Sequence, residues 1–517
     1  MKRIFGRGKG EVGILREFVR RAALWGAVFG LLVVWVGCAR SDQDDQNSAL
    51  IWEDWADGGG NATPESGAAE SEPRDAGEEV SSGAWPGVPH EAPDFEVRRV
   101  TETASWTIWG AEAGLPSWLH GATADASGNV WVAGGEAGLF VLRPNQNEFA
   151  RLGLEDGLTP YAESAAQAGV DFPVYLDVIA VTGGEANTVF VGYRGRSEAG
   201  ALGCEDNWDG PAPDASIYKS GDADRVRLVS DGPDALRIEV AHYDIASGAL
   251  VVPAEPRGRE KVCDIYRILF DARTRSLWFG GNHGYAWGDP DFEPVQNCGA
   301  APACSGVLEH AHPLLNGYLK EGSTSLSALT GGYRGLALEA SGDLWVGGWF
   351  RSQRCPAGAD GRVDFWTCES QALLSQNQID WWPDAVADES RPSGRTDDHV
   401  SDLAVGLDGA LWVGSSHNGL LRRAQDGGTA RMAPEAMVDP SVRALAVDPL
   451  DGSLWIGGAA GGLTRLTGGQ AWHYGAEIFG PSLVSGAAVD IQIDESQQRR
   501  RVLVTFENGG VALYAGD

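Results

Sequence analysis

The stretch DGSLWIGG, Asp451–Gly458, decides how we interpret the fold, because close copies of it recur along this 517-residue chain. Each copy carries one large apolar residue that is usually followed by glycine two positions on. The large residue of each copy is Trp131, Phe190, Trp278, Trp345, Trp412, Trp455 or Leu503. The shortest intervals, from Trp412 to Trp455 and on to Leu503, are close to the roughly 40 to 45 residues of a repeated four-stranded sheet. The chain is therefore built from one repeating unit.

The copy that begins at Ser441 shows the strands of the unit. SVRALAVD, SLWIGG, GLTRLTG and QAWHYG follow one another with turn residues between them, and we call them strands a, b, c and d. Tryptophan in strand b would fill the space between neighbouring sheets, and glycine would let those sheets approach. The seven copies predict an all-β, seven-bladed β-propeller. Eight blades is the alternative, because the interval from Phe190 to Trp278 is long and ASGALVVPAE (246–255) imitates strand b.

The two ends of the repeat region complement each other. After Leu503 only one further strand remains, GGVALYAGD, so the last blade lacks its strand d. ASWTIWGAEAGLPS (104–117) is similar to QAWHYGAEIFGPS (470–482), which is a strand d and its following loop. We therefore predict that an N-terminal outer strand completes the C-terminal blade and closes the ring.

The N-terminal residues differ from the rest. Several basic residues precede the apolar run AALWGAVFGLLVVWVGC, which ends at Cys38. This order predicts a signal peptide over 1–38 with a lipobox-like end, so that Cys38 would be acylated. The alternative is an uncleaved membrane anchor, although the run is shorter than the roughly 20 residues of a spanning helix. Ala39 and Arg40 follow Cys38, so the aspartate that serves as a retention signal in lipoproteins of Gram-negative bacteria is not present there. We therefore expect a lipid-anchored protein of the periplasm or cell surface, at the outer rather than the inner membrane.

Residues 39–95 are acidic and rich in small residues, which predicts a disordered tether before the propeller at 96–517. The alternative is that its apolar island, ALIWEDW (49–55), docks on the folded domain. The formal net charge of −32 and the lack of a basic cluster outside the N-terminus argue against binding of nucleic acid. We expect a monomer.

Six cysteines remain when Cys38 is set apart, and an even number in an exported protein predicts disulfides. The short separations favour Cys298–Cys304 and Cys355–Cys368, which leaves Cys204–Cys263. The alternative is a zinc site formed by Cys298 and Cys304 with His310 and His312, but this spacing fits no standard zinc module. No metal and no cofactor is predicted.

The segment EDGLTPY (155–161), together with DASGNVWVAGGEAGLFVL (125–142), resembles the two-component regulator propeller repeat over about residues 104–517. Matching residues are Asp156, Gly157 and Leu158 in a connection, Asp408, Gly409, Leu411, Trp412 and Gly414 in blade 5, and Gly461, Gly462 and Leu463 in blade 6. The resemblance implies a ligand-binding propeller, which in that family often forms the periplasmic sensor half of a hybrid histidine kinase. No kinase is found in this sequence, so only binding carries over. A resemblance to virginiamycin-lyase-like propellers is weaker.

Connection lengths point to one working face. The b-to-c and d-to-a connections of a propeller share a face, and we assign to them the long segments 154–176, 195–214, 231–263, 290–334, 349–361 and 369–401. All six cysteines lie in or beside these segments. We expect binding at this face, since long loops on a rigid scaffold usually carry it.

Strand a begins near the ring axis on the same face. Counting back from each repeat position gives ligand-binding candidates at His120, Asp177, Arg267, Arg334, Ser401, Arg443 and Asp490, joined by the loop tryptophans Trp349, Trp381 and Trp382. Three arginines could grip a carboxylate or a sulfate. The alternatives are solvated strand ends or structural ion pairs, and burial of the tryptophans beneath the loops. His283 and His417 are expected to cap tight turns.

These features predict a protein that binds a ligand or a protein partner at the loop-rich face, in a sensor-like or scaffold role. One alternative is a propeller lyase or hydrolase that uses His120, Arg267, Arg334 and Arg443. The other is a structural module of an envelope assembly. No catalytic residue is predicted, because the sequence contains none of the familiar nucleophile, zinc-protease or phosphate-loop motifs.

Overall fold

The structure is a computed structural model, and it describes residues 95–160, 174–197, 219–229, 236–245, 249–250, 264–282, 284–294, 305–311, 332–348, 352–359, 361–363, 367–371, 373–374, 399–416, 419–494 and 500–516. The chain divides into two compact units, Met1–Gly77 and Glu78–Asp517. The first unit lies outside the described residues, so everything below concerns the second.

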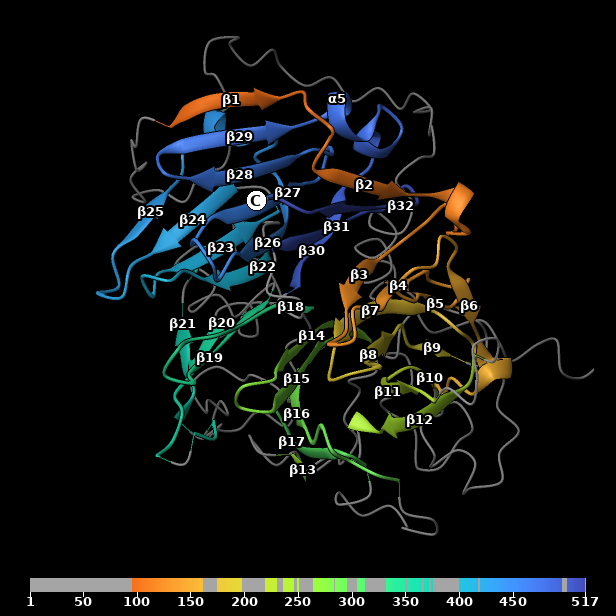
Figure 1. The fold of residues 1–517 in the computed structure, drawn as a ribbon. Coiled ribbons are helices and arrows are strands. Elements are labelled where there is room, and N and C mark those ends of the chain that lie inside the picture. Colours follow the sequence, from red (N-terminus) through yellow and green to blue (C-terminus); the bar gives the residue numbers. More distant parts are fainter. Residues whose placement is uncertain are drawn as a thin grey trace, which may run out of the picture. The chain divides into compact units, whose positions relative to one another are not determined.

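Seven sheets follow one another around a common axis and form the blades of a propeller (Figure 1). In each blade, strands a to d lie side by side in antiparallel order, with strand a innermost. Blade 1 contains β3 (Gly121–Ala124), β4 (Val130–Ala133), β5 (Leu139–Leu142) and β6 (Ala150–Leu152). Blade 2 contains β7 (Val178–Gly183), β8 (Thr188–Tyr193), β11 (Ala223–Leu228) and β12 (Ile238–Tyr243). Blade 3 contains β14 (Ile265–Asp271), β15 (Ser276–Gly281), β16 (Tyr285–Gly288) and β17 (Val307–Ala311).

The remaining blades repeat this order. Blade 4 contains β18 (Tyr333–Leu338), β19 (Leu344–Gly348), β20 (Ser352–Cys355) and β21 (Glu369–Gln371). Blade 5 contains β22 (Val400–Val405), β23 (Leu411–Ser415), β24 (Gly419–Arg423) and β25 (Thr429–Arg431). Blade 6 contains β26 (Val442–Val447), β27 (Leu454–Gly458), β28 (Leu463–Thr467) and β29 (Gln470–Tyr474). Blade 7 contains β30 (Ala488–Asp494), β31 (Arg501–Phe506) and β32 (Gly510–Tyr514), with β2 (Trp106–Trp109) as its outer strand.

The described connections contain a few short helices and one small ribbon. The helices are η1 (Ala111–Ala113), η2 (Leu154–Asp156), η7 (Pro434–Ala436), α5 (Ala476–Phe479) and η8 (Leu483–Ser485). The ribbon pairs β9 (Arg196–Ser197) with β10 (Lys219–Ser220). Within the described residues, no helix has the length and apolar character to cross a membrane.

The seven blades confirm the predicted architecture, and the eight-bladed alternative is wrong. The interval in question contains strands c and d of blade 2 together with β13 (Ala249–Leu250), which comes from the segment that imitates strand b. β13 adds to the outside of β17 as a parallel fifth strand of blade 3. An extra outer strand therefore takes the place of an extra blade.

Two strands from the start of the domain lie on the outside of the last two blades. β2 pairs with β32 in an antiparallel register that matches Trp106 with Tyr514. β1 (Glu96–Val100) pairs in parallel with β29 of blade 6, which the sequence did not lead us to expect. The Trp106 ring contacts the rings of Trp455 and Tyr474 from blade 6 as well as Tyr514 from blade 7. Whether β2 holds the ring closed is a question that we return to below.

The repeat phrase itself is packing, as predicted. Trp131 and Trp455 are fully buried. A side chain at Gly457 would place its Cβ 2.5 Å from the carbonyl oxygen of Ala488, in the inner strand of the next blade. Glycine is needed there because the two blades approach too closely for any other residue.

Blades 4, 5 and 6 carry a further repeated unit that joins strands b and c to the a-to-b turn. The strand-b tryptophan faces an arginine of strand c, and this arginine pairs with an acidic residue of the turn. The three sets are Trp345, Arg354 and Glu339; Trp412, Arg422 and Asp408; and Trp455, Arg465 and Asp451. In blade 3 the arginine is replaced by Trp287, which stacks on Trp278 with an interplanar angle of 18°. We call each arginine set a tryptophan–arginine–acid unit.

The prediction that the excess length and all six cysteines belong to one face is wrong in part. β17 divides the segment that we had assigned whole, so the chain leaves strand c of blade 3 at Gly288 and enters strand d at Val307 on the opposite face. β20 likewise makes 356–368 a c-to-d connection, so the Cys355–Cys368 disulfide also lies at the opposite face. Strands VLEHA (307–311) and SQRC (352–355) lack the repeat phrase, which is why the sequence did not reveal them.

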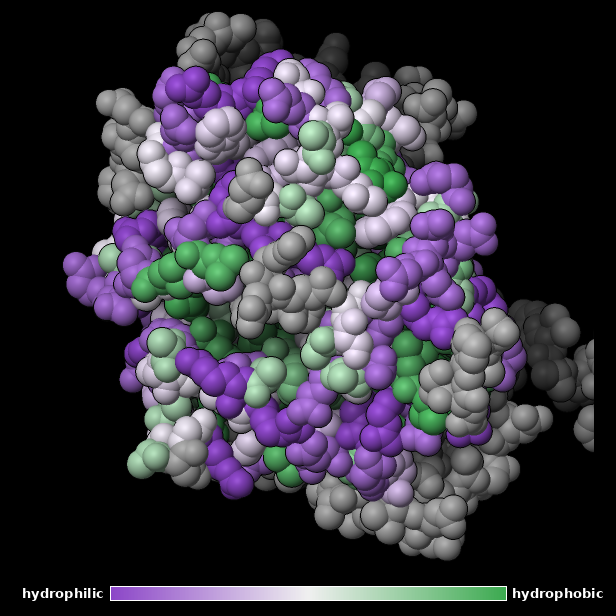
Figure 2. Space-filling model, in the orientation of Figure 1, coloured by the Kyte–Doolittle hydropathy of each residue, from purple (hydrophilic) through white to green (hydrophobic). Residues whose placement is uncertain are grey.

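Five long connections begin and end on the face that we predicted. They are 153–177, 194–222, 244–264, 312–332 and 372–399, and all of them belong to blades 2, 3 and 4 or join these blades to their neighbours. On the side of the ring seen in Figure 2, the described residues are mostly hydrophilic, and the hydrophobic ones form separate patches. That side does not present one continuous apolar surface in the part of the chain that the structure describes.

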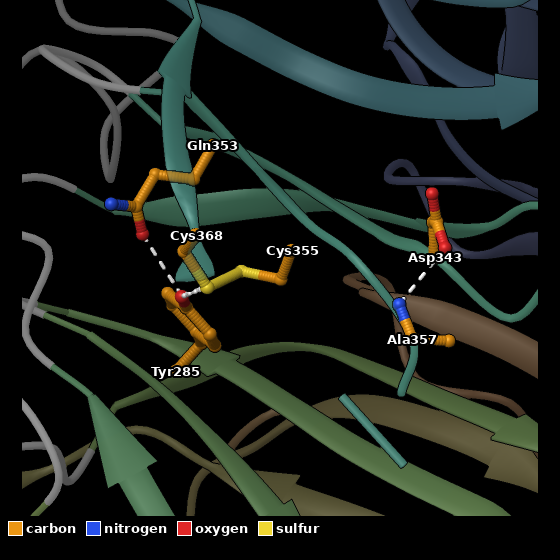
Figure 3. The surroundings of a disulfide bond; sticks show 6 residues. All are labelled: Tyr285, Asp343, Gln353, Cys355, Ala357 and Cys368. Atoms are coloured by element: carbon orange, nitrogen blue, oxygen red, sulfur yellow. Dashed lines mark hydrogen bonds between the residues drawn. A yellow bond between two sulfur atoms is a disulfide. The ribbon is translucent and has the colours of Figure 1, made fainter. Parts of the chain in front are cut away.

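The structure contains the predicted disulfide Cys355–Cys368 (Figure 3). It joins the end of β20 to the residue before β21, and it packs against Tyr285 of blade 3. The Tyr285 hydroxyl donates to Gln353 Oε1 at 2.9 Å and lies 3.2 Å from Cys355 Sγ. The other predicted sulfurs lie outside the described residues, namely Cys38, Cys204, Cys263, Cys298 and Cys304.

Candidate functional site

The inner strands share a β-bulge at their loop-bearing ends. In blades 2 to 7 the pairing of strands a and b skips one residue, which therefore lies outside the ladder of hydrogen bonds. A bulge redirects side chains locally and is common next to functional sites. The skipped residues are Ile179, Tyr266, Arg334, Ser401, Arg443 and Val489, and His120 holds the matching position before β3 in blade 1. We call these seven residues the bulge ring.

The next position along each inner strand forms a second ring. It consists of Gly121, Ala180, Arg267, Gly335, Asp402, Ala444 and Asp490, each of which pairs with strand b of its own blade. Four of the seven are glycine or alanine. The three charged side chains, Arg267, Asp402 and Asp490, are therefore the ones long enough to reach the centre of this ring.

Our predicted site residues fall into these two rings and do not form one. His120, Arg334, Ser401 and Arg443 belong to the bulge ring, whereas Arg267 and Asp490 belong to the second ring. Asp177 precedes β7 and lies in neither. The counting failed because the interval from the bulge to the repeat residue varies, from 11 positions between Arg334 and Trp345 to 14 positions between Val489 and Leu503. Trp349, Trp381 and Trp382, like His283 and His417, lie outside the described residues.

Arg267 reaches across the ring axis to two other blades. Its Nη1 lies 3.0 Å from Asp490 Oδ1 in blade 7, and its Nη2 lies 3.3 Å from Asp402 Oδ1 in blade 5. Both aspartates are buried, with 2% of Asp402 and 6% of Asp490 exposed. Arg267 and Asp490 thus match the structural alternative for the predicted site, and Asp402 is the partner that sequence reasoning missed. We call these three residues the axial network.

The two carboxylates also bond the backbone of neighbouring blades. Asp402 Oδ2 accepts from the N–H of Leu445 in blade 6 at 2.9 Å, and Asp490 Oδ2 accepts from the N–H of Ala122 in blade 1 at 3.3 Å. The inner edge of each strand a has no further strand beside it, so such backbone donors need other partners. The axial network therefore links five blades at the axis.

Burial dominates the ionisation of the axial network. It raises the pKa of Asp402 to about 6, against the attraction of Arg267, and it also raises the pKa of Asp490. Burial alone would lower the pKa of Arg267, but Asp402 and Asp490 outweigh it, so this pKa is raised. Two carboxylates share one guanidinium, and the pair holds a proton more readily than an exposed aspartate does.

Three arginines from different blades gather around the bulge ring. Arg334 comes from blade 4, Arg443 from blade 6 and Arg194 from the end of β8 in blade 2. The Arg334 guanidinium lies over the Tyr266 ring, 4.3 Å from its centre. Burial and then the charge of Arg334 lower the pKa of Arg443 to about 10, while burial and Arg194 contribute to a lowered pKa of Arg334. The three guanidinium groups therefore concentrate positive charge at this end of the ring.

Carboxylates and a neutral histidine surround this cluster. Asp177 Oδ2 lies 3.7 Å from Arg194 Nε, and Asp264 Oδ2 accepts from the Tyr266 hydroxyl at 3.0 Å. Burial, followed by the charges of Arg194 and Arg334, lowers the pKa of His120 to about 3. His120 is therefore an uncharged hydrogen-bonding group at neutral pH.

Ser401 is the remaining polar member of the bulge ring. It is buried, and its hydroxyl has no hydrogen-bond partner among the residues that the structure describes.

Arg194 was missed by sequence reasoning, because it follows strand b, whereas we counted positions at the start of strand a. Only the sequence GYRG after the repeat position of blade 2 marks it.

A buried polar cluster on blade 2 holds one of the long connections. Asp224 Oδ2 accepts from the Tyr193 hydroxyl at 2.6 Å and from the N–H of Thr159 at 2.8 Å, while Asp224 Oδ1 lies 2.8 Å from His242 Nδ1. Thr159 belongs to the connection 153–177. The cluster thus fixes the start of that connection to strands b, c and d of blade 2.

No group of three or more candidate metal ligands occurs among the described residues. Of the four zinc ligands that we considered, His310 alone belongs to this part of the chain, in β17.

Comparison with known proteins yields likenesses of fold alone. No family model matches the chain, and no curated protein matches it. A solved structure described as the mitotic checkpoint complex contains a chain with 11% sequence identity and a TM-score of 0.42, in an alignment that covers 88% of this chain and 99% of the other. A second, described as YCF48 bound to D1 peptide, has 10% identity and a TM-score of 0.42, with 83% and 100% covered. We draw nothing from either about a ligand.

Proposed function

We propose that this protein is a binding protein whose propeller holds an anionic group of its ligand, a carboxylate or a sulfate, at the bulge ring. The observation that supports this most is the gathering of Arg194, Arg334 and Arg443, from three separate blades, at the end of the ring that carries the long connections. Guanidinium groups bind such anions through two parallel hydrogen bonds.

The charge of the chain favours binding of an anion at this one site over attraction of anions to the whole surface. The chain as a whole carries a formal net charge of −32, which repels anions at long range. A local cluster of arginines can overcome this repulsion only at short distance. The stacking of Arg334 on Tyr266 also fixes one guanidinium before the ligand arrives, which reduces the entropy lost on binding.

Binding is better supported than catalysis. The alternative lyase or hydrolase would draw on His120, Arg267, Arg334 and Arg443. Arg267, however, is held by two buried aspartates in the axial network. The pKa of His120 is lowered to about 3, so at neutral pH its imidazole is a weak base and no imidazolium is present to act as an acid. A sensor-like or scaffold role at the loop-bearing face agrees with both observations.

The binding proposal is tested with sulfate, acetate and glucuronate as probes in isothermal titration calorimetry. Arg334→Gln and Arg443→Gln should each weaken the binding of a probe by roughly tenfold or more, because a charge-assisted hydrogen bond is lost. Arg151→Gln is the matched control, since Arg151 is an exposed arginine on outer strand β6. The proposal fails if no probe binds, or if both variants bind every probe as the unaltered protein does.

We also propose that the protein is exported and anchored by a lipid on Cys38. Residues 1–38 have the order of a signal peptide. The Cys355–Cys368 disulfide agrees with this, because disulfides persist mainly in oxidising compartments. In Cys38→Ser cells, palmitate labelling should be lost and the protein should leave the membrane fraction. Retention of Cys38→Ser in that fraction would instead support the uncleaved anchor.

A further inference from the structure

The axial network lies directly beneath the bulge ring along the inner strands. Ser401 of the bulge ring is followed in the chain by Asp402 of the network, and Tyr266 is followed by Arg267. An anion held by the arginines of the bulge ring would therefore lie above Asp402 and Asp490. Its charge and theirs would interact through the poorly solvated centre of the ring, where screening by water is weak.

The network has an uncompensated charge when both carboxylates are ionised. Arg267 supplies one positive charge, and Asp402 and Asp490 supply two negative ones. No further cation reaches these carboxylates among the described side chains, whose other contacts to them are Gln492 and the N–H groups of Leu403, Leu445 and Ala122. One proton on the pair makes the network neutral and removes the repulsion toward an anion above it.

We propose that an anion bound at the bulge ring is held together with one proton taken up by the Asp402 and Asp490 pair. This inference rests on the proposed function. Thermodynamic linkage makes the effect reciprocal: the proton strengthens binding of the anion, and the anion strengthens binding of the proton. The ligand should therefore bind more tightly in mildly acidic than in alkaline solution.

Other titratable groups around the ring are less suited to take the proton. His120 faces Arg194 and Arg334, and its pKa of about 3 lies far below the value of about 6 for Asp402. Asp177 and Asp264 are held by Arg194 and Tyr266 respectively. Arg334 and Arg443 are already protonated, and the charges of Asp439 and Glu507 act on Arg443.

The pH range of the effect follows from the direction of the shift. Well below about pH 5 the pair already carries its proton with or without the anion, so binding takes up none. Well above about pH 8 neither state holds the proton. Uptake should be greatest between these limits, and affinity should fall roughly tenfold from the acidic to the alkaline limit, a typical size for coupling between two sites.

The test is calorimetric titration of the full-length protein with sulfate, whose own charge stays constant over this range. Titrations at about pH 6.5 in bis-tris and in imidazole, whose ionisation enthalpies differ, give the number of protons taken up from the difference in apparent binding enthalpy. We expect about half a proton for the unaltered protein, the most that a tenfold coupling allows, and this value should fall toward zero at about pH 8.5.

Two variants locate the proton. Asp402→Asn should abolish uptake and leave sulfate affinity independent of pH, because Arg267 and Asp490 then balance. Asp408→Asn is the matched control, since Asp408 belongs to the same blade but to the a-to-b turn at its other end, and it should retain the uptake. Asp490→Asn serves as a second variant if circular dichroism shows that Asp402→Asn is not folded, and it should also abolish uptake.

The outcomes separate the two proposals. Sulfate binding that depends on Arg334 but takes up no proton overturns the linkage and leaves the proposed function standing. Uptake that survives in Asp402→Asn and disappears in His120→Gln assigns the proton to the histidine and also overturns it. If sulfate and the other probes do not bind at all, the proposed function fails and the linkage fails with it.

Discussion

The two sides of the ring differ in how far they keep the repeat. Blades 5, 6 and 7 have short connections. The tryptophan–arginine–acid unit occurs in blades 5 and 6 and also in blade 4 on the other side. Blades 2, 3 and 4 carry the five long connections, the added strand β13 and the disulfide. Both sides nevertheless contribute to the bulge ring, with Arg443 from blade 6 and Arg334 from blade 4. The inner strands are thus common to all blades, while additions accumulate outside them.

The largest effect should come from the regular side, where β2 joins the ring. Trp106 contacts four aromatic rings, those of Trp455, Tyr474, Phe479 and Tyr514. We propose that this contact holds the ring closed, and we expect Trp106→Ala to lower the free energy of unfolding by about 3 to 4 kcal/mol. Ile108→Ala, at an exposed position of the same strand, is the control in urea unfolding. Equal, small changes in both variants would show that β2 contributes little to closure.

In blades 2, 3 and 4, the disulfide should supply part of the stability that regular packing between blades supplies in blades 5, 6 and 7. Its two cysteines are 13 residues apart. In the absence of reductant, replacement of both cysteines by serine should lower the free energy of unfolding by about 3 kcal/mol. This is the value typical of a closed loop of this length. Thr367→Ser, in the same connection, should leave stability within about half a kcal/mol. A change in the cysteine variant no larger than in this control would mean that blade 4 needs no covalent support.

The axial network, which both sides share, should give an intermediate effect that depends on pH. Burial raises the pKa of Asp402 in the folded protein to about 6, so the folded state binds this proton more tightly than the unfolded chain does. Ionisation of Asp402 therefore removes stability as the pH rises from about 4 to about 6. We expect a loss on the order of 2 kcal/mol over this range that is absent from Asp402→Asn. Urea unfolding at intervals of pH checks this, and parallel curves for the two proteins would contradict it.

The smallest effect should come from a single tryptophan–arginine–acid unit. Arg422 lies over Trp412 and pairs with Asp408, whose side chain is 55% exposed. Because solvent screens such a pair, we expect Arg422→Gln to lower the free energy of unfolding by about half a kcal/mol. A double-mutant cycle with Trp412→Phe measures the coupling between the two residues. A coupling of several kcal/mol would mean that these units, and not the buried tryptophans alone, hold the regular side together.

The sequence could predict the number of blades because Trp131, Trp278 and Trp455 are needed wherever two sheets pack against each other. It also revealed the likeness between the segments that became β2 and β29, because both supply aromatic residues to the same layer. Such positions carry their own signal, since burial restricts them to large apolar residues.

The sequence could not predict the division of the candidate site into two rings. A bulge adds one residue without any fixed residue type, so Ser401 and Asp402 look equivalent until the pairing with strand b is known. The ion pairs of Arg267 with Asp402 and Asp490 join positions far apart in the chain, and only the closure of the ring brings them together. Arg194 was missed for a similar reason, because it approaches from the end of strand b.

The parallel pairing of β1 with β29 has a mechanical consequence. The chain before Glu96 leads into the propeller through this strand, whose residues Glu96 to Val100 lie in register with Gln470 to Tyr474. A pull on the preceding segment along the strand direction would load all the hydrogen bonds between the two strands together and in shear. Hydrogen bonds that are loaded together in this way resist force far better than bonds that open one after another. The pairing of β1 with β29 would therefore keep a pull on the N-terminal segment from unfolding the blades.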